Sequence, residues 1–209
     1  VLVRYRGKSA ENVTKYRNWL EDIAKGAGLA TQTKETFTVI TGTLDMVGND
    51  VLARNVYGHL KNHFPLTWTD EEQTYAKAIQ KEMGLPEIGM PTDVGEMLTA
   101  AVQQGASSDV GDVSWNVPTM GVLYSAFPVG TAPHTWGWTA CGGMSIGRKG
   151  TIAAAKVVAS SALDLLTQPE LINEAKEEFK KQTKGQQYQS LNELSKPPGG
   201  ELDLGERKV

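Results

Sequence analysis

Cysteine is almost absent from this chain of 209 residues, in which Cys141 is the only one. A single cysteine cannot form an internal disulfide, and such scarcity is typical of a reducing compartment, so we expect a cytoplasmic protein. An excess of one charge is also lacking, because the formal net charge is only -3. That balance gives no reason to expect nucleic acid or an anionic membrane as a partner. No uninterrupted apolar run approaches the roughly 20 residues that would span a bilayer.

The length and the overall composition of the chain predict a globular protein. Hydrophobic residues make up 40% of the chain and charged residues 22%. The length allows one good-sized domain, or one domain and part of another. The chain begins at Val1, inside the β-like stretch VLVRYRG. We therefore expect its true start to lie upstream, together with any targeting segment.

The first 45 residues predict a strand, a helix and a second strand. Residues 1–6 alternate in β fashion, and residues 33–44 are rich in threonine and β-branched side chains. Between them, Ser9 is a good N-cap for a helix with apolar residues at helical spacing that ends near Gly28. A lone unit of this kind has little core, so the pattern predicts half of a small α+β domain.

From Asn49 onward the pattern is mainly helical. Asn49 or Asp50 is expected to cap one helix, and the box from Thr69 to Glu72 to open the next. Residues 121–127 predict a buried strand. An alanine-rich helix follows and is expected to present one apolar side, and a further helix has Pro169 in its first turn. The members of that apolar side are Ile152, Ala155, Ala159, Ala162 and Leu166.

Two histidines stand four residues apart, which is a spacing that can point both rings at one metal. They are His59 and His63, and no carboxylate or cysteine nearby in the sequence completes such a site. Both fall in the last turn of the expected helix, where the helix dipole favours an imidazole. A structural role is therefore the favoured interpretation.

Small and polar residues surround two carboxylates, Asp109 and Asp112, in the stretch ASSDVGDVSW. Such a stretch can shape a ligand pocket, but Ser, Asp and Gly are also ordinary turn residues, and the turn is favoured. The glycines of CGGMSIGRKG precede a helix whose N-terminus can hold an anion. Their spacing matches neither a Walker loop nor the dinucleotide fingerprint, so a phosphate site is only weakly indicated.

The third histidine, His134, lies in VGTAPHTWGWTACGG, directly after a proline and shortly before two tryptophans. Taken alone, such a histidine is more often a packed core residue than a metal ligand. The order of segments changes this interpretation. Four consecutive segments closely resemble the C-terminal end of the two-metal aminoacylase, carboxypeptidase and amidohydrolase family of metallopeptidases. They are SSDVGDVSWNVPT, an expected strand, GTAPHTWGW and SIGRKGTIAAAKVVASSALDLL. Within that family, the chain is most similar to the aminobenzoyl-glutamate utilization branch.

This resemblance implies an α/β fold and three parts. Residues 1–45 would be the second half of an α+β, ferredoxin-like lid or dimerisation domain. Residues 46–185 would be the C-terminal part of a zinc-exopeptidase-like catalytic domain, and residues 186–209 an extended or disordered tail. The implied function is metal-dependent cleavage of the amide bond of an N-acyl amino acid, such as an aminobenzoyl-glutamate-like substrate. The implied partners are the missing N-terminal part of the same protein and a second copy in a homodimer.

The resemblance also assigns residues. Two divalent metal ions, zinc or manganese, would be held mostly by the absent part, which would also supply the general base. His134 would be the last metal ligand. Asp109 or Asp112 would orient its ring or shape the pocket, and Asn49 would lie near the substrate carboxylate. At Arg148 the chain departs from relatives that have histidine there; an arginine could contact a substrate carboxylate or be solvated. The competing hypothesis is a non-catalytic interaction or dimerisation fragment.

Overall fold

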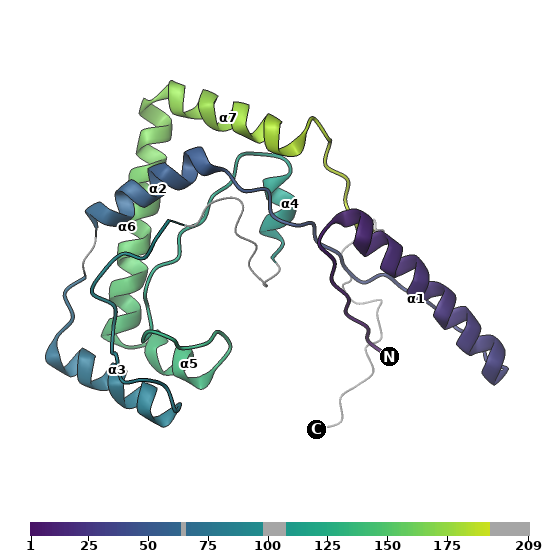
Figure 1. Cartoon of the computed structure of the whole chain (residues 1–209), viewed down its shortest axis with the longest axis horizontal. Coiled ribbons are helices and arrows are strands. Elements are labelled where there is room, and N and C mark those ends of the chain that lie inside the picture. The colour runs from purple at the N-terminus through teal and green to yellow at the C-terminus, as the bar shows by residue number, and fades with distance from the viewer. Residues whose placement is uncertain (64–65, 98–107, 193–209) are drawn as a thin grey trace. The chain divides into compact units, whose positions relative to one another are not determined.

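The computed structural model describes residues 1–63, 66–97 and 108–192, which form seven α-helices and no β-strand (Figure 1). The helices in chain order are α1 (Ala10–Thr31), α2 (Asp50–Asn62), α3 (Asp70–Glu82), α4 (Val110–Ser114), α5 (Trp136–Gly142), α6 (Ser145–Thr167) and α7 (Pro169–Thr183).

The α/β prediction is therefore wrong for the described part of the chain. The three predicted strands, residues 1–6, 33–44 and 121–127, have no regular secondary structure. Neither the ferredoxin-like half-domain nor the sheet of a zinc-exopeptidase-like domain is present among these residues. The physical reason is that β-branched composition favours a strand only when a neighbouring strand takes up its backbone groups. A helix satisfies those groups within its own segment, and the helices expected from the sequence are present.

The chain divides into two compact units, which are described separately. Unit 1 consists of residues 1–47, 104–117 and 183–209, and unit 2 of residues 48–103 and 118–182. The predicted domain boundaries at residues 45 and 185 stay predictions. Of the predicted tail, residues 193–209 lie outside the described residues.

Unit 1 contains α1 and the short helix α4. The Ser9 side chain caps α1 by accepting a hydrogen bond from the backbone N–H of Asn12, as the sequence predicts. The buried Ser114 hydroxyl of α4 accepts from the backbone N–H of Val47 at 2.8 Å and donates to the Gly111 carbonyl at 2.6 Å. The Trp115 indole donates to the Asp45 carbonyl at 2.9 Å. These bonds fasten α4 to the segment that follows α1.

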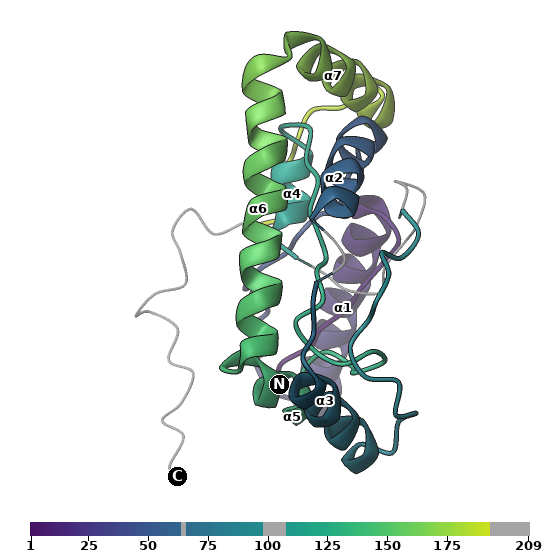
Figure 2. The ribbon, with the colours of Figure 1, turned by 90° about the vertical axis from the view of Figure 1, so that its left-hand side faces the viewer.

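The core of unit 2 lies between α3, α5 and the start of α6, which meet at one end of α6 in both views (Figures 1 and 2). Helix α3 opens with the predicted capping box, in which Thr69 and Glu72 satisfy each other's backbone N–H groups. The buried members of this core are Ala76, Ile79, Met90, Cys141 and Ile146.

Helix α6 packs along α2 through a polar seam as well as through apolar side chains (Figure 2). His59 Nε2 lies 2.6 Å from a carboxylate oxygen of Asp164, and the Asn55 amide donates to the same oxygen at 2.6 Å. One turn further along α2, His63 Nε2 lies 3.2 Å from the Ser160 hydroxyl. Hydrogen bonds from His59 and Asn55 hold the pKa of Asp164 below its ordinary value.

Length and composition alone make α6 the one helix among the described residues that could cross a membrane. No apolar run in the sequence predicted this, because polar residues interrupt the apolar ones along α6. Interior helices of globular proteins also meet this criterion, because a helix that is apolar on all sides is suited to either environment. The two faces of α6 are therefore compared below.

Candidate functional site

His134 lies in the turn just before α5 and belongs to unit 2. Its backbone has a φ of 61°, in the left-handed region that non-glycine residues adopt uncommonly. Its side chain is exposed, and its ring has no hydrogen-bond or ion-pair partner among the described residues. Within the described residues the ring is therefore not packed into a core. An imidazole presented in this way has a free nitrogen lone pair, which is what a metal ligand needs.

The segment before His134 is fixed by a buried glutamine of α3. The Gln80 side chain is fully buried and accepts a hydrogen bond from the Gly89 N–H at 2.7 Å. Its amide nitrogen donates to the Val129 carbonyl at 2.8 Å, and the Val129 N–H donates to the Gly89 carbonyl at 3.1 Å. Gln80 thus ties two loops together and sets where the chain enters the turn. The sequence analysis missed this residue, because a glutamine inside a helical pattern gives no sign of burial.

The segment after His134 is fixed by aromatic packing. Trp138 stacks on Phe127 with ring centroids 4.1 Å apart, and its indole N–H donates to the Thr131 carbonyl at 3.0 Å. The Thr135 hydroxyl donates to the Ala132 carbonyl at 2.8 Å, which closes the turn around His134. A side chain at Gly137 would meet the sulfur of the Met83 side chain and lie close to Thr131 and Ile79, so glycine here lets α5 pack closely against the end of α3. The turn is therefore held on both sides while His134 faces solvent.

The other two histidines are in a different situation. His59 and His63 both have partners on α6, as described above, and are partly buried. Within the described residues no group of three or more His, Cys, Asp or Glu side chains could hold a metal ion. The structural interpretation of His59 and His63 is thus supported by their contacts, and His134 is the histidine that stays available.

Arg148 lies in the first turn of α6 and is exposed. Its neighbour Lys149 is engaged instead: its ammonium group donates to Glu72 at 2.6 Å and to the Thr67 carbonyl at 2.8 Å, and it lies 5.6 Å from the centroid of the Trp68 ring. Burial alone would raise the pKa of Glu72, but hydrogen bonds from Lys149, from Ser145 and from a backbone N–H hold it below its ordinary value. Of these two cations, Arg148 is the one free to meet an anionic ligand.

Asp109 and Asp112 lie in unit 1, at and within α4. Asp109 occupies the N-cap position without making a side-chain cap bond, and it is exposed. Asp112 has one carboxylate oxygen, Oδ1, that is buried and has no hydrogen-bond partner among the described residues. A buried carboxylate oxygen without a donor is costly, so it marks a place where a donor or a cation would fit.

Asn49 is the N-cap of α2 and is buried. Its side-chain oxygen accepts from the Leu52 N–H at 3.0 Å, and its amide nitrogen donates to the Ala175 carbonyl of α7 at 2.9 Å. Both ends of the side chain are therefore used to join α2 to α7. The substrate-binding role of Asn49 stays a prediction, and the structure shows what the residue does within the fold.

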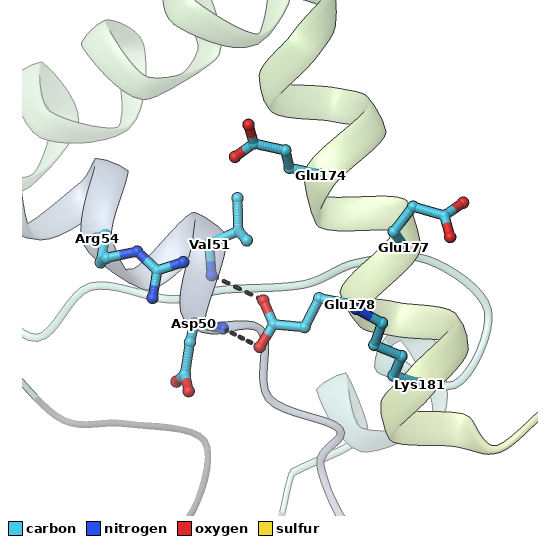
Figure 3. Close-up of a pocket in the computed structure, with 7 residues that line it drawn as sticks. All are labelled: Asp50, Val51, Arg54, Glu174, Glu177, Glu178 and Lys181. Atoms are coloured by element: carbon cyan, nitrogen blue, oxygen red, sulfur yellow. Dashed lines mark hydrogen bonds between the residues drawn. The ribbon is translucent and has the colours of Figure 1, made fainter.

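An open pocket of about 370 Å³ lies beside this helix junction (Figure 3). The Glu178 carboxylate points into the N-terminus of α2 and accepts hydrogen bonds from the N–H groups of Asp50 at 2.9 Å and Val51 at 2.8 Å. The anion-binding position of that helix end is thus taken by the protein's own carboxylate. The remaining lining residues are Arg54, Glu174, Glu177 and Lys181. Their mixed charges do not define a ligand, so we do not place the functional site here.

With this geometry established, comparison with known proteins gives one informative match. The chain is similar to a p-aminobenzoyl-glutamate hydrolase subunit of Escherichia coli (strain K12), with 27% identity over 213 aligned residues. The chain is a distant relative of a hydrolase subunit. The alignment takes in 90% of this chain and 44% of that protein, so the chain spans less than half of its relative's length. No protein-family model and no solved structure matches the chain.

This similarity confirms the resemblance to the aminobenzoyl-glutamate branch that the sequence motifs indicated. It gives a relation to a hydrolase subunit and assigns no role to single residues. The roles of His134, Asn49, Asp109, Asp112 and Arg148 therefore stay predictions, which the geometry above makes easier to test. Three of them, Asn49, His134 and Arg148, belong to unit 2, and the two aspartates belong to unit 1.

Proposed function

We propose that this chain is the C-terminal portion of a metal-dependent amidohydrolase that cleaves the amide bond of an N-acyl amino acid. The substrate would resemble p-aminobenzoyl-glutamate, which the name of the E. coli relative contains. The observation that carries the proposal is the similarity to that hydrolase subunit over 90% of the chain. The exposed His134 on a fixed turn supports it, because a hydrolytic metal centre needs a neutral imidazole held in place.

The turn offers one donor, His134, of the kind that would bind the two divalent metal ions, zinc or manganese, that the resemblance implies. His134 would hold one of them through a ring nitrogen that no residue of the described chain engages. When bound, such ions polarise a scissile carbonyl and lower the pKa of a coordinated water. The role of this chain is to keep the imidazole in place, which Gln80, Thr135 and Trp138 do through the bonds given above. The general base and the other ligands would come from the remainder of the enzyme, and we assign no catalytic residue to this chain.

Arg148 is proposed as a contact for the carboxylate of the amino-acid portion. A guanidinium binds a carboxylate through two parallel hydrogen bonds, and this one is exposed in the first turn of α6. Asp112 is proposed to orient a ligand or to accept a hydrogen bond, since its buried Oδ1 lacks a donor. Asp109 and Asn49 are kept as substrate-binding or orienting candidates of the same proposal.

The proposal includes partners and a location. The chain would act together with the missing N-terminal part of the same protein, in a homodimer, in the cytoplasm, on a small amide and without nucleic acid or membrane. A second candidate function is a non-catalytic interaction fragment. The observation that favours this second candidate is the apolar face that α1 exposes through Trp19 and Ile23. Amide hydrolysis by the polypeptide expressed from its complete reading frame distinguishes the two.

The residue test replaces His134 in that complete polypeptide. We expect His134→Ala to bind metal about 10- to 1000-fold more weakly, extrapolating from the smaller effects of residues that orient ligands, and to lose hydrolysis of p-aminobenzoyl-glutamate. His134→Gly should lose metal equally without a lower melting temperature, because glycine adopts the left-handed backbone without strain. Bound metal per chain, hydrolysis rate and melting temperature are measured together.

His63→Ala is the matched control, since it removes a histidine that pairs with Ser160. We expect this control to lower the melting temperature and to leave metal content unchanged. Full metal occupancy in His134→Ala, with hydrolysis intact, would remove His134 from the site. Loss of metal in both variants alike would show that the effect comes from damage to the fold.

A further inference from the structure

Helix α6 has two apolar faces, and only one of them is packed. The face toward α2 and α5 is buried, and its members are Ile146, Gly147, Gly150, Ala153, Val157 and Ser161. At 3.6 residues per turn these positions follow one another along a single side of the helix. This is not the side that the sequence pattern indicated. The predicted apolar side, from Ile152 to Leu166, is the one that lies open.

The outward face is apolar along about four turns. Ile152 is 58% exposed, Leu163 60% and Leu166 83%, with small alanines between them. Lys156 lies at the margin of this face, and Arg148 lies one turn before Ile152 on the same side of the helix. The exposed residues that define the outward face of α6 are Ile152, Ala155, Val158, Ala159, Ala162, Leu163 and Leu166. An apolar stripe of this width and length normally faces a core.

The surroundings of α6 argue against a lipid occupant. A helix that spans a bilayer must keep polar groups out of the hydrocarbon or satisfy them internally. The opposite side of α6 carries Asp164 in contact with His59 and Asn55, and Lys156 falls near the middle of the helix. Those charges suit a helix enclosed by protein better than one surrounded by acyl chains.

The length of the relative identifies the occupant that fits. This chain covers 44% of the E. coli hydrolase subunit, so more than half of that protein lies outside the match. A helix with apolar faces on two opposite sides fits the interior of a larger protein. We propose that the outward face of α6 is a docking surface for apolar residues of the enzyme that lie outside these 209 residues. This inference rests on the proposed function only in taking the chain as part of a longer enzyme.

The small side chains describe how close the contact is. Ala155, Ala159 and Ala162 lie within the outward face, flanked by the larger Ile152 and Leu163. Alanine leaves room for the backbone or large side chains of the occupant to approach, and the larger residues fill the sides. Interfaces of this kind pack at the density of a protein interior, so even a small polar probe is kept out.

The test measures access to this face in the polypeptide expressed from its complete reading frame. Ala159→Cys and Ala155→Cys each place a thiol on the outward face with little change in volume. Lys176→Cys on the exposed side of α7 is the control, and the fully buried Cys141 reports whether the protein is folded. We expect the two outward-face thiols to react at least about tenfold more slowly than the control thiol, since a covered thiol reacts only when its cover opens. Mass spectrometry of the labelled peptides gives each rate.

A second measurement identifies the occupant. A photoreactive benzoylphenylalanine in place of Lys156, at the margin of the face, should cross-link to residues outside these 209. Rapid labelling of both outward-face thiols while Cys141 is protected would overturn the inference. A cross-link to any of these 209 residues, in the same chain or in a second copy, would also overturn it. The same holds if the thiols are protected from labelling only when phosphatidylcholine vesicles are added. If the two outward-face thiols react slowly but the protein does not hydrolyse the amide, the docking surface is supported and the proposed function is refuted. If the thiols react rapidly and the amide is hydrolysed, the docking surface is refuted and the proposed function is supported.

Discussion

At the scale of single residues, the most informative feature is the contrast between the three histidines. Their sequence contexts favour a structural role for His59 and His63, and the contacts with Asp164 and Ser160 agree with it. His134 is followed in the sequence by two tryptophans, yet its side chain is exposed and its backbone is left-handed. No composition rule gives this φ angle, because it is imposed by the two fixed ends of the turn. His134 became a candidate only through the motif around it.

Other residues of the site region show the same limit. The capping box of Thr69 and Glu72 could be predicted, because both partners lie within one turn of sequence. The bond from Lys149 to Glu72 could not, because it joins positions on separate helices. Gln80 was missed for the same reason. Hydrogen bonds between residues close in sequence can therefore be predicted from the sequence. Hydrogen bonds between distant segments can be identified only once the fold is known.

Glu72 gives a prediction about pH. Its carboxylate has a pKa held below the ordinary value of 4.5, so its charged form stabilises the folded state. That contribution is fully present above pH 4.5 and is lost as the pH falls through the lowered pKa. Glu72→Gln should lower the melting temperature at neutral pH and should lose less stability than the wild type when the pH is lowered below 4.5. Melting curves over a pH series measure both effects.

Glu82→Gln, on the exposed last turn of the same helix, controls for the removal of a carboxylate. Its stability should follow the wild-type curve closely. If Glu72→Gln and the wild type lost stability in parallel from neutral to acid pH, the ion pair with Lys149 would not contribute to folding.

At the scale of elements, helices could be predicted and strands could not. The starts of α1, α2 and α3 at Ser9, Asn49 and Thr69 agree with the capping residues in the sequence. The segments 1–6, 33–44 and 121–127 have strand-like composition and are not strands in this structure. A strand depends on a neighbour that a single segment cannot specify. The packed side of α6 did not follow from the sequence either, because apolar residues lie on two opposite sides of this helix.

Two helical glycines give opposite predictions. A side chain at Gly150 of α6 would collide with the Ser125 carbonyl and the Ala126 backbone, neither of which can move cheaply. Gly58 of α2 has open space around it. Alanine is favoured over glycine in a helix interior by about 1 kcal/mol, so Gly58→Ala should raise the free energy of unfolding by up to that amount. Gly150→Ala should lower it despite the same gain in propensity.

Chemical denaturation of the two variants side by side makes this comparison, with each serving as the other's control. A Gly150→Ala variant as stable as Gly58→Ala would mean that α6 and the segment at residues 125–126 are further apart than the structure places them.

At the scale of the whole molecule, the candidate site is incomplete by its own chemistry. One histidine does not make a metal centre, and no group of three ligands is present among the described residues. The chain spans less than half of its hydrolase relative, and both α1 and α6 expose apolar faces. These observations agree with a chain that works within a larger assembly, for which the outward face of α6 offers one contact and α1 another. That the chain is part of a longer enzyme stays a prediction from the sequence motifs, while the two open faces required the structure.

The last prediction concerns the face of α1. Tyr16, Trp19 and Ile23 recur at helical spacing, and Trp19 is 64% exposed and Ile23 55%. Because burying a large apolar side chain contributes about 1.5–3 kcal/mol, this face has enough surface to hold two copies together. We expect the polypeptide expressed from its complete reading frame to be a homodimer at micromolar concentration. Trp19→Glu should weaken the dimer at least about tenfold, since each 1.4 kcal/mol changes an equilibrium constant by that factor.

Asn18→Glu adds the same charge at an exposed neighbouring position that points away from this face, so its dimer should persist. Light scattering over a dilution series gives the dissociation constants of the wild type and both variants. A wild type that stays monomeric at micromolar concentration and above would contradict the homodimer. Residues 18 and 19 are adjacent in sequence but lie about 100° apart around the helix, so a contact made by the Trp19 side should distinguish them. If both substitutions weakened the dimer equally, the effect would come from added charge on α1 as a whole.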